Sequence, residues 1–248
     1  MKNNKTGKKT AAFFDLDKTL LNGESQAMEA RYFIEKNRFS PVYGFKILGV
    51  VAASFAYKNK WMSPWRYNQI YVSTYKGQQI DLLKEQGTEL YGLRIKPALF
   101  AGMIAVMEMH RRKGHLIVLI SATAEHLLEP VKNDMNADFM IATKLETTPL
   151  GICTGKAEGR ICVGKQKCRL INQLAKDHGI NLQSSYAYSD HHADIPFLSA
   201  VGNPVAVNPT RDLKDEAEKN KWEVMTTDAL FITDSRERHT PVNPDIIG

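Results

Sequence analysis

Two aspartates, Asp15 and Asp17, stand one residue apart directly after a short apolar run. Such a run predicts a buried strand over residues 11–14. In an extended chain, residues i and i+2 point to the same side, so the two carboxylates share one small volume where open α/β sheets place their ligands. Carboxylates this close require a cation, a shared proton or nearby lysines. Thr19 follows with a hydroxyl that either hydrogen-bonds a phosphate oxygen or braces the loop. The simpler alternative is a strand that ends in an acidic turn.

A second polar group closes the next predicted core strand, which covers residues 115–121 and ends at Ser121. The following helix is predicted to begin at Ala122 and to continue to about residue 135. The Ser121 hydroxyl and the backbone N–H groups of such a helix start are suited to holding phosphate oxygens. A serine that ends a strand is common, so this position gains meaning only beside the others.

Two lysines, Lys165 and Lys167, lie at the start of a predicted helix that ends at His178. A cation is unfavourable beside the positive end of a helix dipole, and one placed there can serve to neutralise the aspartates and a bound phosphoryl group. We favour Lys167, because the apolar residues that follow it at helical spacing would seat its side chain near the core. An ordinary surface lysine is the alternative, and the choice between the two lysines stays open.

A third strand is predicted to end at Asp190, with Asp194 one helical turn further on. Magnesium prefers hard oxygen ligands, usually one or two carboxylates together with phosphate and water. Asp190, Asp15 and the backbone carbonyl of Asp17 would supply the protein's share, and Asp194 would bind through water or orient Lys167. The neighbouring His191 and His192 suggest a transition-metal site, but adjacent side chains diverge, which disfavours it.

The elements that must position these residues alternate between predicted strands and helices, which is typical of βαβ units and a parallel sheet. Residues 23–94 differ, because they show helical patterns without an obvious strand; Ser63 and Pro64 are expected to begin one of these helices. We therefore expect an α/β fold, with a Rossmann-like parallel-sheet core over residues 1–22 and 95–248 and an inserted helical cap domain over residues 23–94. Residues from about Ser235 are expected to form a loose tail.

Composition narrows the class of protein. The 248 residues are 43% hydrophobic and 24% charged, which is ordinary for a soluble globular chain. The net charge of +6 favours anionic substrates, and the lysines near the start lack the aromatic platform of a nucleic-acid site.

Three cysteines without a CxxC pair indicate reduced thiols in a cytoplasmic protein. The basic N-terminus lacks the apolar run and cleavage site of a signal peptide. The most apolar stretch, residues 47–57, is shorter than the roughly 20 residues that span a bilayer, so no stable membrane insertion is expected. The oligomeric state stays open.

The pattern Asp-x-Asp-x-Thr-Leu after an apolar strand resembles the first motif of the haloacid dehalogenase superfamily, and the serine, lysine and aspartate positions resemble its three later motifs. The resemblance covers nearly the whole chain and is nearest to the phosphoserine phosphatase-like group, subfamily IB, whose helical cap of the C1 type lies between the first and second motifs. It implies a magnesium-dependent phosphatase that hydrolyses a small phosphomonoester through an aspartyl-phosphate intermediate.

The same resemblance implies a role for each matching residue. Asp15 is the nucleophile and Asp17 the general acid and base. The phosphate is bound around Thr19, Ser121 with the adjacent Ala122, and Lys167, and the magnesium ion is served by Asp15, Asp17, Asp190 and Asp194. Glu24 falls where phosphoserine phosphatases carry a glutamate that meets the substrate's amino group. An acidic residue in a helix's first turn is the alternative for Glu24.

Several positions depart from the resemblance. Ala122 and Thr123 stand where these enzymes usually have glycines, and Ala193 stands where they have an asparagine. The apolar residues 44–57 in the cap leave open a phosphotransferase, or a phosphatase of an amphiphilic ester of the lysophospholipid type. A non-catalytic phosphate-binding module is a further alternative, but mere binding does not need the acid and base at Asp17.

Overall fold

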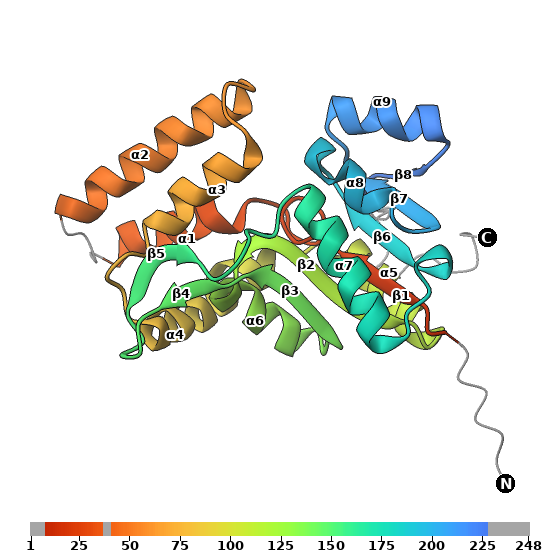
Figure 1. Ribbon diagram of the computed structural model, residues 1–248, viewed down its shortest axis with the longest axis horizontal. Coiled ribbons are helices and arrows are strands. Elements are labelled where there is room, and N and C mark those ends of the chain that lie inside the picture. The colour runs from red at the N-terminus through yellow and green to blue at the C-terminus, as the bar shows by residue number, and fades with distance from the viewer. Residues whose placement is uncertain (1–7, 37–40, 228–248) are drawn as a thin grey trace, which may run out of the picture.

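The structure is a computed structural model that describes residues 8–36 and 41–227 (Figure 1). A six-stranded sheet in the order β3-β2-β1-β6-β7-β8 forms its centre, and every neighbouring pair of strands is parallel. The chain fills the sheet outward from β1 in one direction and then returns to its other side, so the switch point lies between β1 and β6. The predicted α/β class is confirmed. The strands are β1 (Ala11–Phe14), β2 (Leu116–Ala124), β3 (Phe139–Thr143), β6 (Tyr186–Ser189), β7 (Asn203–Val207) and β8 (Glu223–Met225).

Helices cover both faces of this sheet, as a parallel sheet requires. Successive residues of β1 alternate between two hydrophobic clusters: Ala12 and Phe14 join one, and Ala11 and Phe13 the other. The first cluster is closed by α5 (Ala101–Arg112) and α6 (Glu125–Asp134). The second is closed by α7 (Lys165–His178), α8 (Ile195–Leu198) and α9 (Arg211–Asn220).

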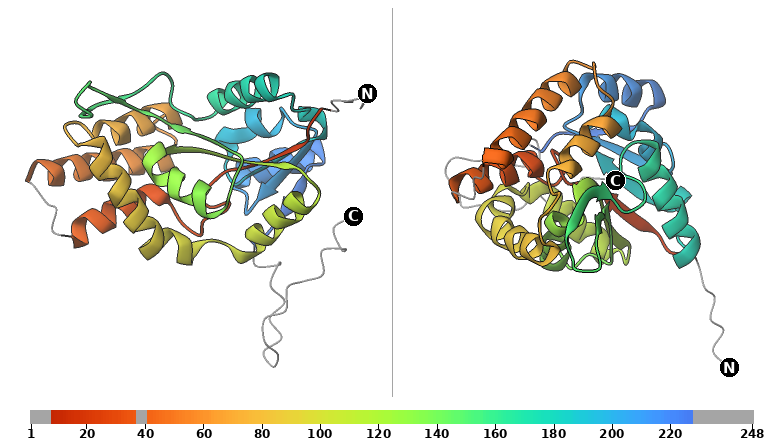
Figure 2. Two further views of the ribbon diagram at one scale, coloured as in Figure 1. Left: turned by 90° about the horizontal axis from the view of Figure 1, so that it is seen from below. Right: turned by 60° about the vertical axis from the view of Figure 1, so that its left-hand side comes forward.

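Four helices lie between β1 and α5 in the chain and gather at one end of the molecule (Figures 1 and 2). Helices α2 and α3 pack against each other, and α4 packs on α6 of the sheet region. As predicted, Ser63 caps α3 by accepting a hydrogen bond from the Arg66 N–H, and Pro64 is the first helical residue. These helices are α1 (Ser25–Glu35), α2 (Pro41–Lys58), α3 (Pro64–Ser73) and α4 (Ile80–Leu90).

An antiparallel hairpin of β4 (Leu145–Thr147) and β5 (Cys153–Ala157) joins this helical end, with β5 packed on α3. Gln79 also forms an isolated bridge with Ile152 of the hairpin's connection. This hairpin, which follows β3 in the chain, is therefore part of the helical end. The domain boundaries at residues 22 and 94 stay a prediction.

A buried polar cluster fixes α1 to its neighbours. The carboxylate of Glu29 in α1 accepts hydrogen bonds from the Tyr71 and Tyr75 hydroxyls, the latter at 2.6 Å. Its other oxygen lies 2.9 Å from Nε2 of His126 in α6. Because all four side chains are buried, this cluster ties the helical end to the helix that follows β2.

Several boundaries differ from the sequence prediction. Strand β2 continues to Ala124, past a register shift between Ile120 and Ala124, so Ala122 does not start a helix. Helix α5 begins at Ala101, after a π-helical turn (Tyr91–Ile95) and a 3₁₀ turn (Lys96–Ala98). Strand β8 was not predicted. The remaining 3₁₀ turns are Leu182–Ser184 and His192–Asp194. The predicted tail from Ser235 lies outside the described residues.

Candidate active site

The carboxyl ends of β1, β2 and β6 meet at one edge of the sheet, and a cavity of 980 Å³ opens there. Asp15 follows β1 directly, and its backbone N–H donates to the carbonyl of Tyr188 in β6 at 3.0 Å, which continues the sheet pairing by one residue. Its Oδ1 accepts from the Leu16 N–H at 2.8 Å. The position of Asp15 is thus fixed by backbone contacts on both sides.

Lys167 supplies a positive charge at this edge of the sheet. Its Nζ lies 2.9 Å from Oδ1 of Asp15 and 2.7 Å from Oδ2 of Asp194, and the residue is only 2% exposed. Burial alone disfavours a charged lysine, yet the two carboxylates raise its pKa above the ordinary range. Lys165, two residues earlier in the same helix, is exposed. Of the two lysines that the sequence left open, the structure brings Lys167 to the aspartates.

Asp194 is held by this lysine and by a serine. The Ser189 hydroxyl donates to Oδ2 of Asp194 at 2.7 Å and lies 3.4 Å from Oδ2 of Asp15. Asp194 is therefore in the place predicted for a residue that orients Lys167. Its predicted contact to a magnesium ion through water stays a prediction.

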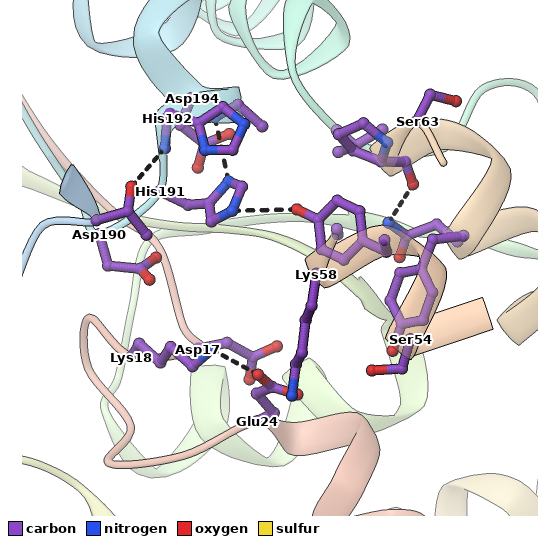
Figure 3. A pocket seen from close by; sticks show the side chains of 18 of the residues that line it. Asp17, Lys18, Glu24, Ser54, Lys58, Ser63, Asp190, His191, His192 and Asp194 are labelled. Atoms are coloured by element: carbon purple, nitrogen blue, oxygen red, sulfur yellow. Dashed lines mark hydrogen bonds and ion pairs between the residues drawn. The ribbon is translucent and has the colours of Figure 1, made fainter. Parts of the chain in front are cut away.

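Asp190 lies close by without such partners. Its side chain is buried, at 4% exposure, and its carboxylate accepts no hydrogen bond from any residue that the structure describes (Figure 3). Burial, followed by the charges of Asp15 and Asp194, raises the pKa of Asp190 to about 8. Burial likewise raises the pKa of Asp15 to about 7, against the lowering effect of Lys167. A buried carboxylate without a donor is costly unless a cation or a proton joins it.

This donor set fits magnesium. Among residues 8–36 and 41–227, no three His, Cys, Asp or Glu side chains converge as a ready metal cage. Magnesium does not need one, because it is usually bound by one or two carboxylates plus phosphate oxygens and water. Asp15 and Asp190 are two carboxylates that could bind it, and among the described residues Oδ2 of Asp15 has only the 3.4 Å contact to Ser189.

Of the two histidines beside Asp190, whose ring centroids lie 4.1 Å apart and so do not diverge as predicted, His191 is not free to bind a metal. Nδ1 of His191 accepts from the Ala193 N–H at 3.1 Å, and its Nε2 lies 3.2 Å from the Tyr57 hydroxyl. Burial, followed by the charge of His192, lowers the pKa of His191 to about 4, so the ring is neutral. With Nδ1 accepting, Nε2 carries the proton and donates to Tyr57. Both nitrogens of His191 are therefore engaged within the protein.

Asp17 is held apart from the lysine, on the α1 side of the cavity. Its Oδ1 accepts from the Ser25 N–H at 2.7 Å, and its Oδ2 accepts from the Ser25 hydroxyl at 3.1 Å. The Thr123 hydroxyl lies 3.4 Å from the same oxygen and 2.8 Å from the Ser25 hydroxyl. Burial raises the pKa of Asp17, although the hydrogen bonds from Ser25 oppose it. Such a carboxyl keeps a proton more readily than a free aspartate does, which suits a general acid.

The remaining predicted phosphate ligands divide into two groups. Ser121 and Ala122 both line the cavity, and the Ser121 hydroxyl accepts from the Thr123 N–H at 3.1 Å. Thr19 does not line it. The Thr19 side chain is fully buried, and its hydroxyl has no hydrogen-bond partner among the described residues. The predicted contact of Thr19 with phosphate thus has no support from its position.

Glu24 lines the cavity on its substrate-facing side and forms an ion pair with Lys18. It is the N-cap residue of α1, but its side chain makes no capping hydrogen bond. Figure 3 shows Lys58 reaching from α2 towards Glu24. Burial raises the pKa of Glu24, but Lys18 and then Lys58 outweigh it and hold the pKa below the usual range. The carboxylate is ionised and faces the cavity, flanked by lysines.

The wall opposite the aspartates comes from α2, α3 and the turn between them. Tyr57 stacks on Tyr67 with ring centroids 5.1 Å apart, and Lys60 of the turn pairs with Asp212 of α9 at 2.6 Å. Residues from the helical end and the sheet region therefore enclose one cavity. From the helical end the lining includes Gln26, Ser54, Tyr57, Lys58, Lys60, Trp61, Met62, Ser63, Pro64, Tyr67 and Asn68.

Sequence reasoning missed several of these residues. Ser189 precedes Asp190 at a strand end, so its position gave a usable signal. Thr123 was noted only as a departure from glycine, although its hydroxyl contacts Asp17 and Ser25. Nothing in the spacing of Tyr57 indicates that it would reach His191, because that contact depends on how α2 packs.

The parallel sheet and its aspartate edge define the class of protein. The chain matches the sequence model of the haloacid dehalogenase-like hydrolases over residues 12–199 and belongs to this family. It is 31% identical over 223 residues to phosphoserine phosphatase SerB1 of Mycobacterium tuberculosis, covering 86% of this chain and 70% of that protein. It is 29% identical over 230 residues to a histidinol-phosphatase of Neisseria meningitidis serogroup C, covering 88% and 98%.

Solved structures are similar as well. A protein of unknown function from Bordetella pertussis Tohama I superposes with a TM-score of 0.79 at 26% identity, covering 89% of this chain and all of that one. A phospho-aspartyl intermediate analogue of phosphoserine phosphatase gives a TM-score of 0.65 at 21% identity, covering 89% and 94%, and shows the shared fold. The protein is a phosphoric monoester hydrolase, which sets aside the alternative of a non-catalytic module.

Proposed function

We propose that the protein is a magnesium-dependent phosphatase that hydrolyses a small phosphomonoester through a phosphorylated Asp15. The observation that carries this proposal is the pair of buried carboxylates, Asp15 held by Lys167 and Asp190 without a hydrogen-bond donor among the described residues. Asp15, Asp190 and the backbone carbonyl of Asp17 would hold Mg²⁺, which offsets negative charge on the phosphoryl oxygens when bound.

The carboxylates divide the reaction into two steps. In the first, an Asp15 oxygen forms a bond to phosphorus and the ester P–O bond breaks, while protonated Asp17 gives its proton to the leaving alkoxide. In the second, Asp17 accepts a proton from water, whose oxygen attacks phosphorus and releases phosphate from Asp15. Lys167 and the Ser121 hydroxyl would hold the phosphoryl oxygens throughout. The raised pKa of Asp17 supports its protonated form in the first step.

We propose phosphate esters of small amino alcohols, phosphoserine and histidinol phosphate among them, as the substrate class. The names of the two relatives support this choice. The ionised Glu24 on the cavity wall supports it too. Its carboxylate can accept a charge-assisted hydrogen bond from an ammonium group once its ion pair with Lys18 opens. An amphiphilic phosphate ester is the second candidate, favoured by the exposed apolar residues of α2 beside the cavity. Phosphoryl transfer to an alcohol in place of water is a variant of the same chemistry.

The decisive experiment measures phosphate release from phosphoserine, histidinol phosphate, a lysophosphatidate and p-nitrophenyl phosphate, with magnesium and after thorough chelation. We expect turnover only with the metal, and the highest kcat/KM for one of the two amino-alcohol esters. Full activity after chelation would contradict the magnesium assignment. A preference for the lysophosphatidate would replace the substrate class but leave the chemistry.

We also propose a reducing, cytoplasmic location. Cys153, Cys162 and Cys168 are all free thiols, and the first two are buried. No helix in the described part of the chain is long and apolar enough to cross a membrane.

A further inference from the structure

The outward face of helix α2 is apolar. Leu48, Val51 and Phe55 follow each other at helical spacing and are 64%, 58% and 61% exposed. The other exposed residues between positions 47 and 57 are Gly49 and Ala52, so no polar side chain interrupts this face. Figures 1 and 2 show α2 as an outermost helix, with α3 on its inner side.

The inner side of α2 is apolar too. Ala53 is buried there and Val50 packs against the main hydrophobic cluster. A helix that is apolar all round is normally buried on all sides. Here the described residues cover only the inner side, and the apolar outer face is exposed.

An exposed aromatic residue extends this face to the mouth of the cavity. Trp61, in the turn after α2, is 76% exposed and meets the Phe55 ring edge to face, with centroids 5.8 Å apart. We call Leu48, Val51, Phe55 and Trp61 the hairpin face. Because Trp61 also lines the active-site cavity, the hairpin face borders the entrance for substrate.

The chain segment that carries the hairpin face has charges of one sign, although Lys60 pairs with Asp212 of α9. The sequence carries seven lysines and arginines between Glu35 and Asp81 and not one aspartate or glutamate. Arg66 and Lys76 are exposed, and Lys58 and Lys60 lie at the end of α2 beside Trp61. A surface with apolar and aromatic residues amid cations fits a partner that is both apolar and anionic.

We propose that the hairpin face docks on an anionic lipid surface, with α2 lying in the plane of the interface. Leu48, Val51 and Phe55 would enter the boundary between headgroups and acyl chains, while the lysines extend to the lipid phosphates. No helix among residues 8–36 and 41–227 can span a bilayer, so this docking is peripheral. A second copy of the chain is a poorer occupant, because its own hairpin would bring the same positive charges into contact.

Vesicle binding of the full chain tests this without any substrate, so its result is independent of the proposed function. The protein is mixed with vesicles of phosphatidylcholine alone or with an equal share of phosphatidylglycerol, and sedimentation and tryptophan fluorescence are recorded. We expect at least about 10-fold tighter binding to the anionic vesicles, weakened by added salt. The L48S/V51S/F55S variant should lose this binding. The matched control L82S/L93S/L150S changes three exposed apolar residues elsewhere and should keep it.

Charge is tested in the same assay. R66Q/K76Q should weaken binding to anionic vesicles, whereas K84Q/K156Q, which removes two exposed lysines away from α2 and α3, should change it less. Binding that ignores lipid charge, or that survives L48S/V51S/F55S, would overturn the proposal. So would a dimer, measured by light scattering, that dissociates in L48S/V51S/F55S, because a second copy would then be the occupant.

Discussion

The two sides of the cavity are built in different ways. We call the side at the carboxyl ends of the strands the floor, and the side formed by α2 and the turn after it the roof. On the floor, Asp15, Asp194 and Lys167 are buried, and Lys167 joins the other two within 3 Å of each. On the roof, α2 and its turn contact the sheet region through the Tyr57–His191 hydrogen bond and the exposed Lys60–Asp212 ion pair. The floor is held by buried ion pairs at the ends of paired strands, whereas the roof is held by contacts that are partly exposed to solvent.

This difference indicates that the floor fixes the reacting groups and that the roof determines selectivity. Breaking a buried ion pair by removing one partner costs about 3–5 kcal/mol, whereas an exposed pair contributes about 0–1 kcal/mol. The floor is therefore rigid enough to fix reacting atoms, and the roof can change with modest cost. Chemistry is expected to fail when the floor is altered, and selectivity when the roof is altered.

The largest loss of activity is expected from Asp15→Asn on the floor. The amide keeps the shape of the carboxylate but cannot form the acyl phosphate, so turnover should fall by about 10⁴-fold or more. Circular dichroism and thermal unfolding should show a folded protein, since Leu16 and Lys167 still have an oxygen to bind. A variant with near-normal phosphate release would refute Asp15 as the nucleophile.

The second break separates the two lysines. Lys167→Met leaves Asp15 and Asp194 close together without a cation, so we expect a loss of about 3–5 kcal/mol in the free energy of unfolding. Any folded fraction should be slower by about 10²–10³-fold, because the phosphoryl oxygens lose a positive partner. Chemical denaturation and steady-state kinetics measure both quantities.

Lys165→Met is the matched control, because Lys165 lies on the same helix end but is exposed. Its free energy of unfolding should change by less than about 0.5 kcal/mol. If the two substitutions had equal effects, the distinction between a buried floor and its surface would be wrong.

The third prediction concerns pH and magnesium. Without a cation the pKa values of Asp15 and Asp190 are raised to about 7 and about 8 from 3.8. Between these limits the folded protein holds protons that the unfolded chain has released, so the contribution of these groups to stability falls as pH rises from about 4 to about 8. Magnesium binds the deprotonated carboxylates, so its stabilising effect should grow over the same interval.

Thermal unfolding with and without magnesium, from about pH 6 to about pH 9, measures this effect. The rise in Tm on adding magnesium should be small at the acid end and larger above about pH 8. Asp190→Asn should remove the part of the pH dependence that Asp190 contributes and leave the part that Asp15 contributes. A magnesium effect that is constant across this range would contradict the metal site at these carboxylates.

The floor could be predicted from the sequence because each of its residues follows a predicted strand or begins a predicted helix. Parallel strands bring such ends to one edge, so the apolar run before Asp15 and the strand before Asp190 were sufficient to place them. The choice of Lys167 over Lys165 followed from the apolar spacing of its helix. The error at Ala122 arose because a register shift prolongs β2 where propensity alone favours a helix start.

The roof could not be predicted in the same way. Residues 44–57 were noted as apolar, but their sequence does not say which side of the helix packs on α3 and which faces outward. The pairing of Glu24 with Lys18 and the contact of Tyr57 with His191 join segments whose approach depends on tertiary packing. Thr19 shows the converse, since a residue in a recognisable motif proved to be buried away from the cavity.

The smallest expected effect lies at Glu24 and Lys18, which line the cavity between β1 and α1. If Glu24 binds the ammonium group of an amino-alcohol phosphate, Glu24→Gln should lower kcat/KM for phosphoserine or histidinol phosphate by about 10-fold and leave p-nitrophenyl phosphate nearly unchanged. Lys18→Met should act in the opposite direction. It frees the Glu24 carboxylate from its ion pair, so the ratio of the two kcat/KM values should rise by a few fold. Steady-state kinetics on both substrates give the ratio for each variant. Two variants that shift it in the same direction, or not at all, would leave Glu24 a partner of Lys18 alone and would exclude amine recognition by Glu24.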